Sequence, residues 1–454
     1  MKNKIPSWRK WMYGSGDLGF SLTSTIVAAY FAIFLTDVVG VPAKIAAIAI
    51  FVGRTWDYVN DPLFGYISDR TRTRWGRRRP YLLFGPIPFA IIFALMWWKP
   101  PIQGDIALAV YYAFIYVLYD AAATMIYMPY FALTPELTSD YDERTSLQSV
   151  RAFFSIFGSL LAFTIPLMII NGFSPGHASN IFRMGLLFGI VSAIPLYVVF
   201  FGTRERPEFM NQKQPGLRES IRASLQNRPF IFGTIIYLFT WVTVDILQTI
   251  LLYFIKYVVN REGSSDVIMA TIFVVGICAL PLWTWTSRRL NKRLAYIIGM
   301  AFFAAVLLVL INLTPATPLY LILILCVLAG IGVSAAHVIP WAIIPDAIEY
   351  GELKTGERHE GMFYSLISLS QKVASSFAIP LALLVLDATG YIPNSLQQPS
   401  SAILGIRIVT GPIPAVMMCI GILFAILYPL GRERYTQIAQ ELEDRRSANN
   451  KGGS

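Results

Sequence analysis

Charged residues are scarce in this chain: of its 454 residues, 14% are charged and 55% are apolar. A soluble domain carries about 25% charged residues, so the composition excludes an ordinary water-soluble protein. Cysteine is also scarce, and the three cysteines have no metal-ligand spacing, so we expect small buried hydrophobes. The sequence has no HExxH, GxSxG or P-loop motif, and an enzyme is therefore not expected.

Long apolar runs dominate what the sequence does contain. Mean hydropathy is +0.56, and runs of about 20 apolar residues recur along the chain, as in transmembrane helices. The pattern predicts an all-α membrane protein with twelve transmembrane helices in a lipid bilayer. The expected spans are residues 12–36, 44–67, 80–98, 105–133, 147–171, 181–202, 229–257, 265–286, 294–312, 317–344, 360–388 and 404–430.

The basic residues lie mainly in alternate short loops. The formal net charge is +10, but this arrangement is a topology signal and does not form a groove for nucleic acid. The positive-inside rule places both termini in the cytoplasm, which predicts a multi-pass protein of the cytoplasmic (inner) membrane. We expect an uncleaved first helix, because the N-terminal segment has no cleavage site of small residues.

A long loop at residues 203–228 divides the expected helices into six and six. Two six-helix halves around a site at the midplane are the common plan of secondary transporters. We therefore expect a first half at 1–202 with a cation site, a linker at 203–228, a second half at 229–430 and a cytoplasmic tail at 431–454. A monomer is expected.

Two carboxylates and an amide lie inside the apolar second span. Asp57, Asn60 and Asp61 share one helix face, because positions i, i+3 and i+4 are neighbours. Charge at membrane depth is kept mainly where it faces a cavity, a partner or a bound ion. Nearby carboxylates repel unless a cation or proton neutralises them, and oxygen ligands suit a hard cation. The cluster predicts a small-cation site; the alternative is internal salt bridges that fix helix register.

Further polar side chains inside the spans are candidates for substrate binding. In the fourth span, Asp120, Thr124 and Tyr127 recur at helical spacing. Lys372 in the eleventh span is expected to close the cavity by pairing with a carboxylate. Lone His337 fits a packing role slightly better than a ligand role, although its depth allows a substrate contact. The other candidates from this pattern are Asp17, Arg151 and Gln371.

The loop at 65–80 has a glycine and an aspartate followed by clustered arginines. It resembles the loop signature of the major facilitator superfamily. An aspartate at a helix end beside arginines can latch one half to the other in one conformation, and we expect this role for Asp69 with Arg70 and Arg77. The alternative is that the arginines only set topology, and both can hold.

Four segments resemble the glycoside–pentoside–hexuronide:cation symporters, the family of melibiose permease. They are Tyr13–Asp17, Trp56–Pro62 with Arg74–Gly76, Arg151 with Phe153 and Phe154, and Pro345–Glu352. The resemblance covers nearly the whole chain and implies the major facilitator fold. It also implies that Na⁺, Li⁺ or H⁺ binds at Asp57, Asn60, Asp61 and Thr124. No cofactor other than this coupling cation is expected.

The same resemblance implies a sugar substrate, with Arg151 in contact with the sugar and Lys372 near the cation site. The substrate side departs from the melibiose pattern, because Ser21 and Tyr127 stand where that permease has aspartates. A neutral glycoside of another shape or an anionic glycoside is therefore expected in place of a galactoside. Lysophospholipid symporters share the fold and cation motif, so a lipid substrate is the main alternative, and a membrane enzyme or sensor is a third.

Overall fold

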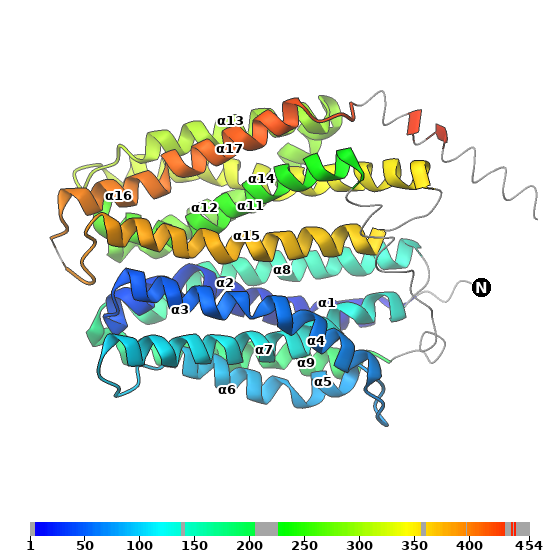
Figure 1. Cartoon of the computed structure of the whole chain (residues 1–454), viewed down its shortest axis with the longest axis horizontal. Coiled ribbons are helices and arrows are strands. Elements are labelled where there is room, and N and C mark those ends of the chain that lie inside the picture. Colours follow the sequence, from blue (N-terminus) through cyan, green and yellow to red (C-terminus); the bar gives the residue numbers. More distant parts are fainter. Residues whose placement is uncertain are drawn as a thin grey trace, which may run out of the picture. The chain divides into compact units, whose positions relative to one another are not determined.

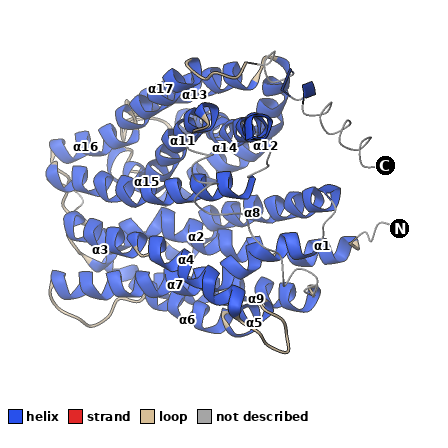
Figure 2. Ribbon diagram, turned by 45° about the vertical axis from the view of Figure 1, so that its right-hand side comes forward, coloured by secondary structure: helices blue, strands red, loops and turns tan. Residues whose placement is uncertain are grey.

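The computed structural model describes residues 5–137, 141–204, 226–355, 360–395, 397–431, 437–438 and 440–441. These residues form helices joined by short loops, as Figure 2 shows, with one isolated bridge between Thr73 and Gly76. The predicted all-α fold is confirmed. Most of the expected linker, residues 205–225, and most of the expected tail lie outside the described residues.

Helical segments occupy all twelve expected spans, and within the described residues ten of them are long and apolar enough to cross a membrane. The other two spans are each built from two shorter helices. The second span consists of α3 (Ala43–Thr55) and α4 (Asp57–Arg70). The third consists of α5 (Arg79–Phe84) and α6 (Pro86–Met96), and α6 begins at a proline, which has no N–H to continue the preceding helix.

The contacts within the chain divide it into two units. Unit 1 comprises Met1–Gln212, Gln248–Ala270 and Ser376–Ile406. In this unit α2 packs against α8 and α9, α3 packs against α7, and α6 packs against α9 (Figure 1). Besides α3 to α6, the elements of its first segment are α1 (Ser7–Gly14), α2 (Gly16–Ile33), the π-helix η1 (Phe34–Val39), α7 (Asp105–Leu137), α8 (Tyr141–Ile170), η2 (Pro175–His177) and α9 (Ala178–Gly202).

Unit 2 comprises Lys213–Leu247, Thr271–Ser375 and Arg407–Ser454, and in it α13 packs against α14 and α17. The two units are thus discontinuous in sequence, and four helices, α11, α12, α15 and α16, contribute residues to both. The proposed division into six and six helices stays a prediction. The remaining elements of the chain are α11 (Arg228–Tyr253), the π-helix η4 (Phe254–Val258), η5 (Glu262–Ser264), α12 (Ser265–Arg289), α13 (Lys292–Leu310), α14 (Leu319–Thr355), α15 (Glu360–Ala388), α16 (Ser400–Thr410) and α17 (Pro412–Ile426).

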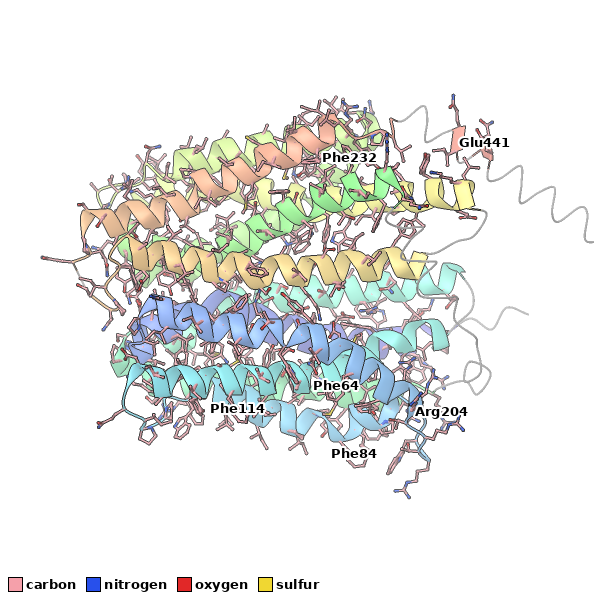
Figure 3. The ribbon with its side chains drawn as sticks, in the orientation of Figure 1. Phe64, Phe84, Phe114, Arg204, Phe232 and Glu441 are labelled. Carbon is pink, nitrogen blue, oxygen red and sulfur yellow. The ribbon has the colours of Figure 1, made fainter. Side chains whose placement is uncertain are left out.

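Aromatic side chains fill the interior of unit 1, and apolar side chains also cover its outside. Phe34 and Trp97 are completely buried, and their ring centroids lie 5.4 Å apart. Phe84 and Phe114 lie at the outer surface and are 60% and 61% exposed (Figure 3). Exposing large apolar side chains to water is unfavourable, but contact with lipid tails is favourable for them.

The cysteines follow the same inside-and-outside arrangement. Cys326 is buried, as expected, but Cys278 and Cys419 are exposed, so the expectation of three buried thiols is wrong for two of them. A small apolar side chain faces lipid as readily as it faces a protein interior, so burial could not be inferred from an apolar run alone.

A fully buried carboxylate, Asp37, lies in η1 at the end of the first span. The ammonium of Lys256, from η4, is 2.6 Å from its Oδ2, and the hydroxyl of Thr36 donates to its Oδ1 over 3.0 Å. The hydroxyls of Tyr257 and Tyr391 also donate to this carboxylate. Burial, and then the charge of Asp37, raise the pKa of Tyr391 well above its ordinary value, so this phenol remains a donor. The cluster joins segments of unit 1 that are more than 350 residues apart along the chain.

The two segments that meet at Asp37 have the same local geometry. Each is a π-helix, and they begin at Phe34 and Phe254, 220 residues apart. A left-handed residue follows each of them: Gly40, with φ of 92°, comes directly after η1, and Asn260, with φ of 55°, lies two residues after η4. A π-helix is rare, and it widens one turn so that the side chains after it change direction.

We predict that Asp37→Ala lowers the free energy of unfolding by about 3–5 kcal/mol, because it leaves the Lys256 ammonium without its carboxylate. Removing both charges, with Asp37→Asn and Lys256→Met, should recover most of that loss. Unfolding of the solubilised protein in a denaturing detergent series measures both. If the double variant is as unstable as Asp37→Ala, the ion pair does not explain the effect.

Candidate functional site

Two helices of unit 1 meet at the cluster of intramembrane acids. On α4, Asn60 donates through Nδ2 to Oδ2 of Asp120 over 2.9 Å. One turn further along α7, the hydroxyl of Thr124 donates to Oδ1 of Asp61 over 3.3 Å. The structure therefore brings together three of the four predicted cation ligands, and it adds Asp120, which we had expected on the substrate side.

The helix break beside the cluster places Asp57 at the first residue of α4. Arg54 lies in the last turn of α3, and its Nε donates to the hydroxyl of Tyr116 over 3.3 Å. Tyr116, Asp120 and Thr124 follow one another at four-residue intervals, so they form one row along α7. At one end of this polar row, Tyr116 contacts Arg54 of α3. Further along the row, Asp120 and Thr124 contact Asn60 and Asp61 of α4.

One oxygen in this cluster has no hydrogen-bond partner. Asn60 is completely buried, and its Oδ1 accepts no hydrogen bond in the structure. A buried acceptor left in this state costs about 1–3 kcal/mol, which a bound cation would offset. The donor set here consists of amide, hydroxyl and carboxylate oxygens, which hard cations such as Na⁺ prefer, so the residues fit the predicted ion.

Within the described part of the chain, no group of three or more His, Cys, Asp or Glu side chains is placed to hold a metal ion. A monovalent cation needs fewer anionic ligands, because less charge has to be balanced. Asn60 and Thr124 would supply neutral oxygen beside the carboxylates.

Arg151, the expected sugar contact, is held by a carboxylate from α2. Its Nε lies 2.5 Å from Oδ2 of Asp17, and its Nη2 donates to Oδ1 over 3.3 Å. The hydroxyl of Tyr130 donates to the same carboxylate over 2.7 Å, and the guanidinium lies 4.8 Å from the ring of Phe131. A bidentate pair of this kind neutralises both charges, so Arg151 does not add net positive charge here.

Two other expected substrate contacts lie in helix–helix packing. Ser21 is 3% exposed and donates to the hydroxyl of Ser155 on α8 over 3.0 Å. Tyr127 is 2% exposed, and its ring packs edge-on against Phe20 with a centroid distance of 4.8 Å. The hydroxyl of Tyr127 is buried without a hydrogen-bond partner. Of these two residues, Tyr127 is therefore the one whose hydroxyl is still available to bond to a substrate.

A second polar cluster lies in unit 2, on α11, α14 and α15. The hydroxyl of Tyr237 donates to Oε1 of Gln371 over 2.6 Å, and the rings of Trp241 and His337 are 5.0 Å apart. Nδ1 of His337 donates to a backbone carbonyl over 2.9 Å, which leaves Nε2 of a neutral ring as an acceptor. Predicted substrate contacts His337 and Gln371 thus belong to one cluster.

Asp245 also belongs to this cluster, although it was not among the expected substrate contacts. Its carboxylate accepts a hydrogen bond from Ser375, one helix away. It is recognisable in the sequence as an acid within the apolar seventh span. Lys372 lies on α15 in the same unit, and its expected closeness to the cation site stays a prediction.

The expected latch lies at the end of α4. Arg70 is the last residue of this helix, and Arg77 lies in the loop that leads to α5. Reciprocal backbone hydrogen bonds between Thr73 and Gly76, of 3.2 and 3.1 Å, close this loop into a tight turn. The side chain of Asp69 lies outside the described part of the chain, so its latch role stays a prediction.

This fold, with buried charge pairs and an oxygen-lined cluster between helices, is that of a secondary transporter of the major facilitator superfamily. The chain resembles the inward-open xylose transporter XylE of E. coli, with a TM-score of 0.66 at 14% identity over 95% of this chain and 98% of that one. The model of the family described as "MFS/sugar transport protein" matches residues 12–432, so the chain belongs to that family, which includes proteins like melibiose permease.

Relatives along the full length carry the same class of activity in their names. An uncharacterized symporter of Synechocystis sp. is 31% identical over 98% of both chains. The glucuronide carrier protein homolog of Escherichia coli is 27% identical over 98% of this chain and 97% of its own. The sodium-dependent lysophosphatidylcholine symporter 1-A of Danio rerio is 28% identical over 95% and 87%.

These findings confirm the family and the fold predicted from the sequence. The protein is a multi-pass membrane symporter for a small molecule, and it is a transporter and not an enzyme. The similarity does not by itself carry over the substrate or the cation of any one relative.

We predict that Arg151→Lys destabilises the protein by about 1–3 kcal/mol although the charge is kept. Lysine cannot make the two parallel bonds to Asp17 or lie flat against Phe131. Arg289→Lys is the matched control, because Arg289 also lies near an aromatic ring, 5.3 Å from the centroid of Trp285, and is exposed. Equal melting temperatures for both variants would contradict a structural role for the bidentate pair.

Proposed function

We propose that this protein is a cation-coupled symporter that imports a sugar or glycoside by alternating access. Na⁺ is the proposed coupling ion, with H⁺ and Li⁺ as the other candidates, and the proposed location is the cytoplasmic membrane with both termini in the cytoplasm. The observation that carries the proposal is the buried, unpartnered Oδ1 of Asn60 beside the Thr124–Asp61 hydrogen bond. The family description and the arginine-rich loops support it.

The proposed cation site consists of Asp57, Asn60 and Asp61 with the hydroxyl of Thr124. A bound cation would neutralise part of the acidic charge and replace the repulsion between carboxylates by attraction. It would also give the amide oxygen of Asn60 a partner. These three effects lower the free energy of burying the occupied cluster relative to the empty one. A carrier needs this difference when it moves a site between the two sides of a membrane.

The helix α7 offers a physical route for coupling between ion and substrate. Thr124 and Tyr130 lie on this helix, separated by about 9 Å along its axis at 1.5 Å per residue. Tyr130 is bonded to Asp17, which holds Arg151, the proposed sugar contact. A shift of α7 on cation binding would therefore reach Arg151 through two hydrogen bonds, and the reverse effect must be equal by linkage.

The proposed substrate is a sugar or glycoside because the unit 2 cluster contains side chains that can hydrogen-bond to sugar hydroxyl groups and stack on a sugar ring. Trp241 and His337 present ring faces and edges, while Gln371 and Asp245 present an amide and a carboxylate, the groups that bind polyols. An anionic glycoside stays a candidate, although it would have to exchange with Asp17 for the fork of Arg151. A lysolipid is the second candidate, on the strength of the related Danio rerio symporter.

We predict that Asp61→Asn abolishes cation-driven accumulation while the protein remains folded, because it removes a ligand and its charge. Uptake of labelled substrate into proteoliposomes, with and without a Na⁺ gradient, is the measurement. Asp105→Asn makes the same chemical change at an exposed carboxylate on α7 and should leave accumulation intact. If the Asp61→Asn variant still transports substrate uphill at the normal rate, the assignment of the ion site is wrong.

Substrate class can be decided by competition binding to the purified protein. We predict that a glycoside binds at least about tenfold more tightly when Na⁺ is present, by the reciprocity of linked binding. The panel contains melibiose, neutral pentosides, glucuronides, sulfonated sugars and a lysophosphatidylcholine. Binding of the lysolipid alone would favour the second candidate, and melibiose ahead of the glucuronides and sulfonated sugars would exclude an anionic preference.

A further inference from the structure

The side chain of Asn60 has a donor end and an acceptor end, and its neighbours decide which way each end faces. Nδ2 is 2.9 Å from Oδ2 of Asp120. An ionised carboxylate can only accept a hydrogen bond, so the amide must turn its N–H end toward Asp120. The oxygen then faces the other way, where it is buried and has no hydrogen-bond partner.

This orientation matters for a cation, since a reversed amide would present two N–H groups to it. Those hydrogens carry positive partial charge and would repel the ion, whereas Oδ1 would ligate it. Asn60 is next to Asp61 in the chain, and Asp61 is bonded to Thr124 one turn beyond Asp120. α7 therefore makes two hydrogen bonds to α4, one for each of these adjacent side chains.

We propose that Asp120 is a positioning residue for the coupling cation: it fixes the amide of Asn60 so that Oδ1 faces the ion. The inference rests on the cation site proposed above. It moves Asp120 away from the substrate and assigns it a role that acts through Asn60. Thr124 gives Asp61 the corresponding support, so the polar row on α7 sets the geometry of the ligands on α4.

Two other roles for Asp120 would give different results in mutants. If Asp120 only adds negative charge near the ion, its removal weakens cation binding whether or not Asn60 is present. If Asp120 is itself a ligand, its removal likewise weakens cation binding both with and without Asn60. If Asp120 acts through Asn60, its removal has no further effect once Asn60 is gone, because coupled residues are not additive.

The test is a double-mutant cycle on cation binding, read without substrate and without transport. Purified protein in lipid nanodiscs is titrated with Na⁺, and binding is followed both by the rise in melting temperature and by equilibrium binding of radioactive Na⁺. The variants are Asn60→Ala, Asp120→Ala, the pair of them, and Asp120→Asn. Asp105→Asn is the control for an exposed acid on the same helix.

We expect each alanine variant to weaken Na⁺ binding by about tenfold, the size of one hydrogen bond to a charged group, and the double variant to be no weaker than Asn60→Ala. Asp120→Asn keeps an acceptor for Nδ2 without the charge, so it should lose about threefold or less. A double variant that is about a hundredfold weaker, or Asp120→Asn as weak as Asp120→Ala, would overturn the positioning role.

The outcomes also separate this inference from the proposed function. If the wild-type protein binds neither Na⁺ nor Li⁺, the cation site itself fails, and the role of Asp120 fails with it. If the wild type binds Na⁺, and Asp61→Asn does not, but the cycle is additive, only the positioning role fails. Should Asp120→Ala not fold, the comparison of Asp120→Asn with wild type and with Asn60→Ala decides the question.

Discussion

Charge at membrane depth needs a partner, and that need organises unit 1. Asp17 binds Arg151 and so ties α2 to α8, while Asp37 binds Lys256 and ties η1 to η4. Losing one member of such a pair costs several kcal/mol, because the other charge then has neither water nor a counter-ion. The apolar surfaces between these helices could slide or rotate at little cost, since lipid is as apolar as leucine. The ion pairs are what fix one arrangement.

The helices could be predicted from the sequence because a transmembrane helix is a local property. A run of apolar residues long enough to cross a bilayer leaves few alternatives, and all twelve expected spans are helical. The grouping of Asp57, Asn60 and Asp61 was predictable for the same reason, since they lie within two turns of one helix, and their role as a cation site stays a prediction. The breaks in the second and third spans were missed, although a proline marks one of them.

Contacts between distant segments could not be predicted in this way. Asp120 was expected with the substrate, because its spacing fixes its face on α7 but not which helix that face meets. The pairing of Asp17 with Arg151 joins residues 134 positions apart, which no local pattern encodes. Asp37 was missed because it lies one residue beyond the expected end of the first span, where an acid reads as part of a loop.

The matched π-helices at Phe34–Val39 and Phe254–Val258 bear on the ancestry of the chain. An unusual wide turn that recurs after 220 residues, with a left-handed residue just after it each time, is the pattern that an internal structural repeat produces. At equivalent positions the copies now differ: Asp37 corresponds to Tyr257, and Thr36 to Lys256. One copy supplies the acceptor and the other the cation and a donor. The two segments thus contribute complementary groups to the one contact where they meet.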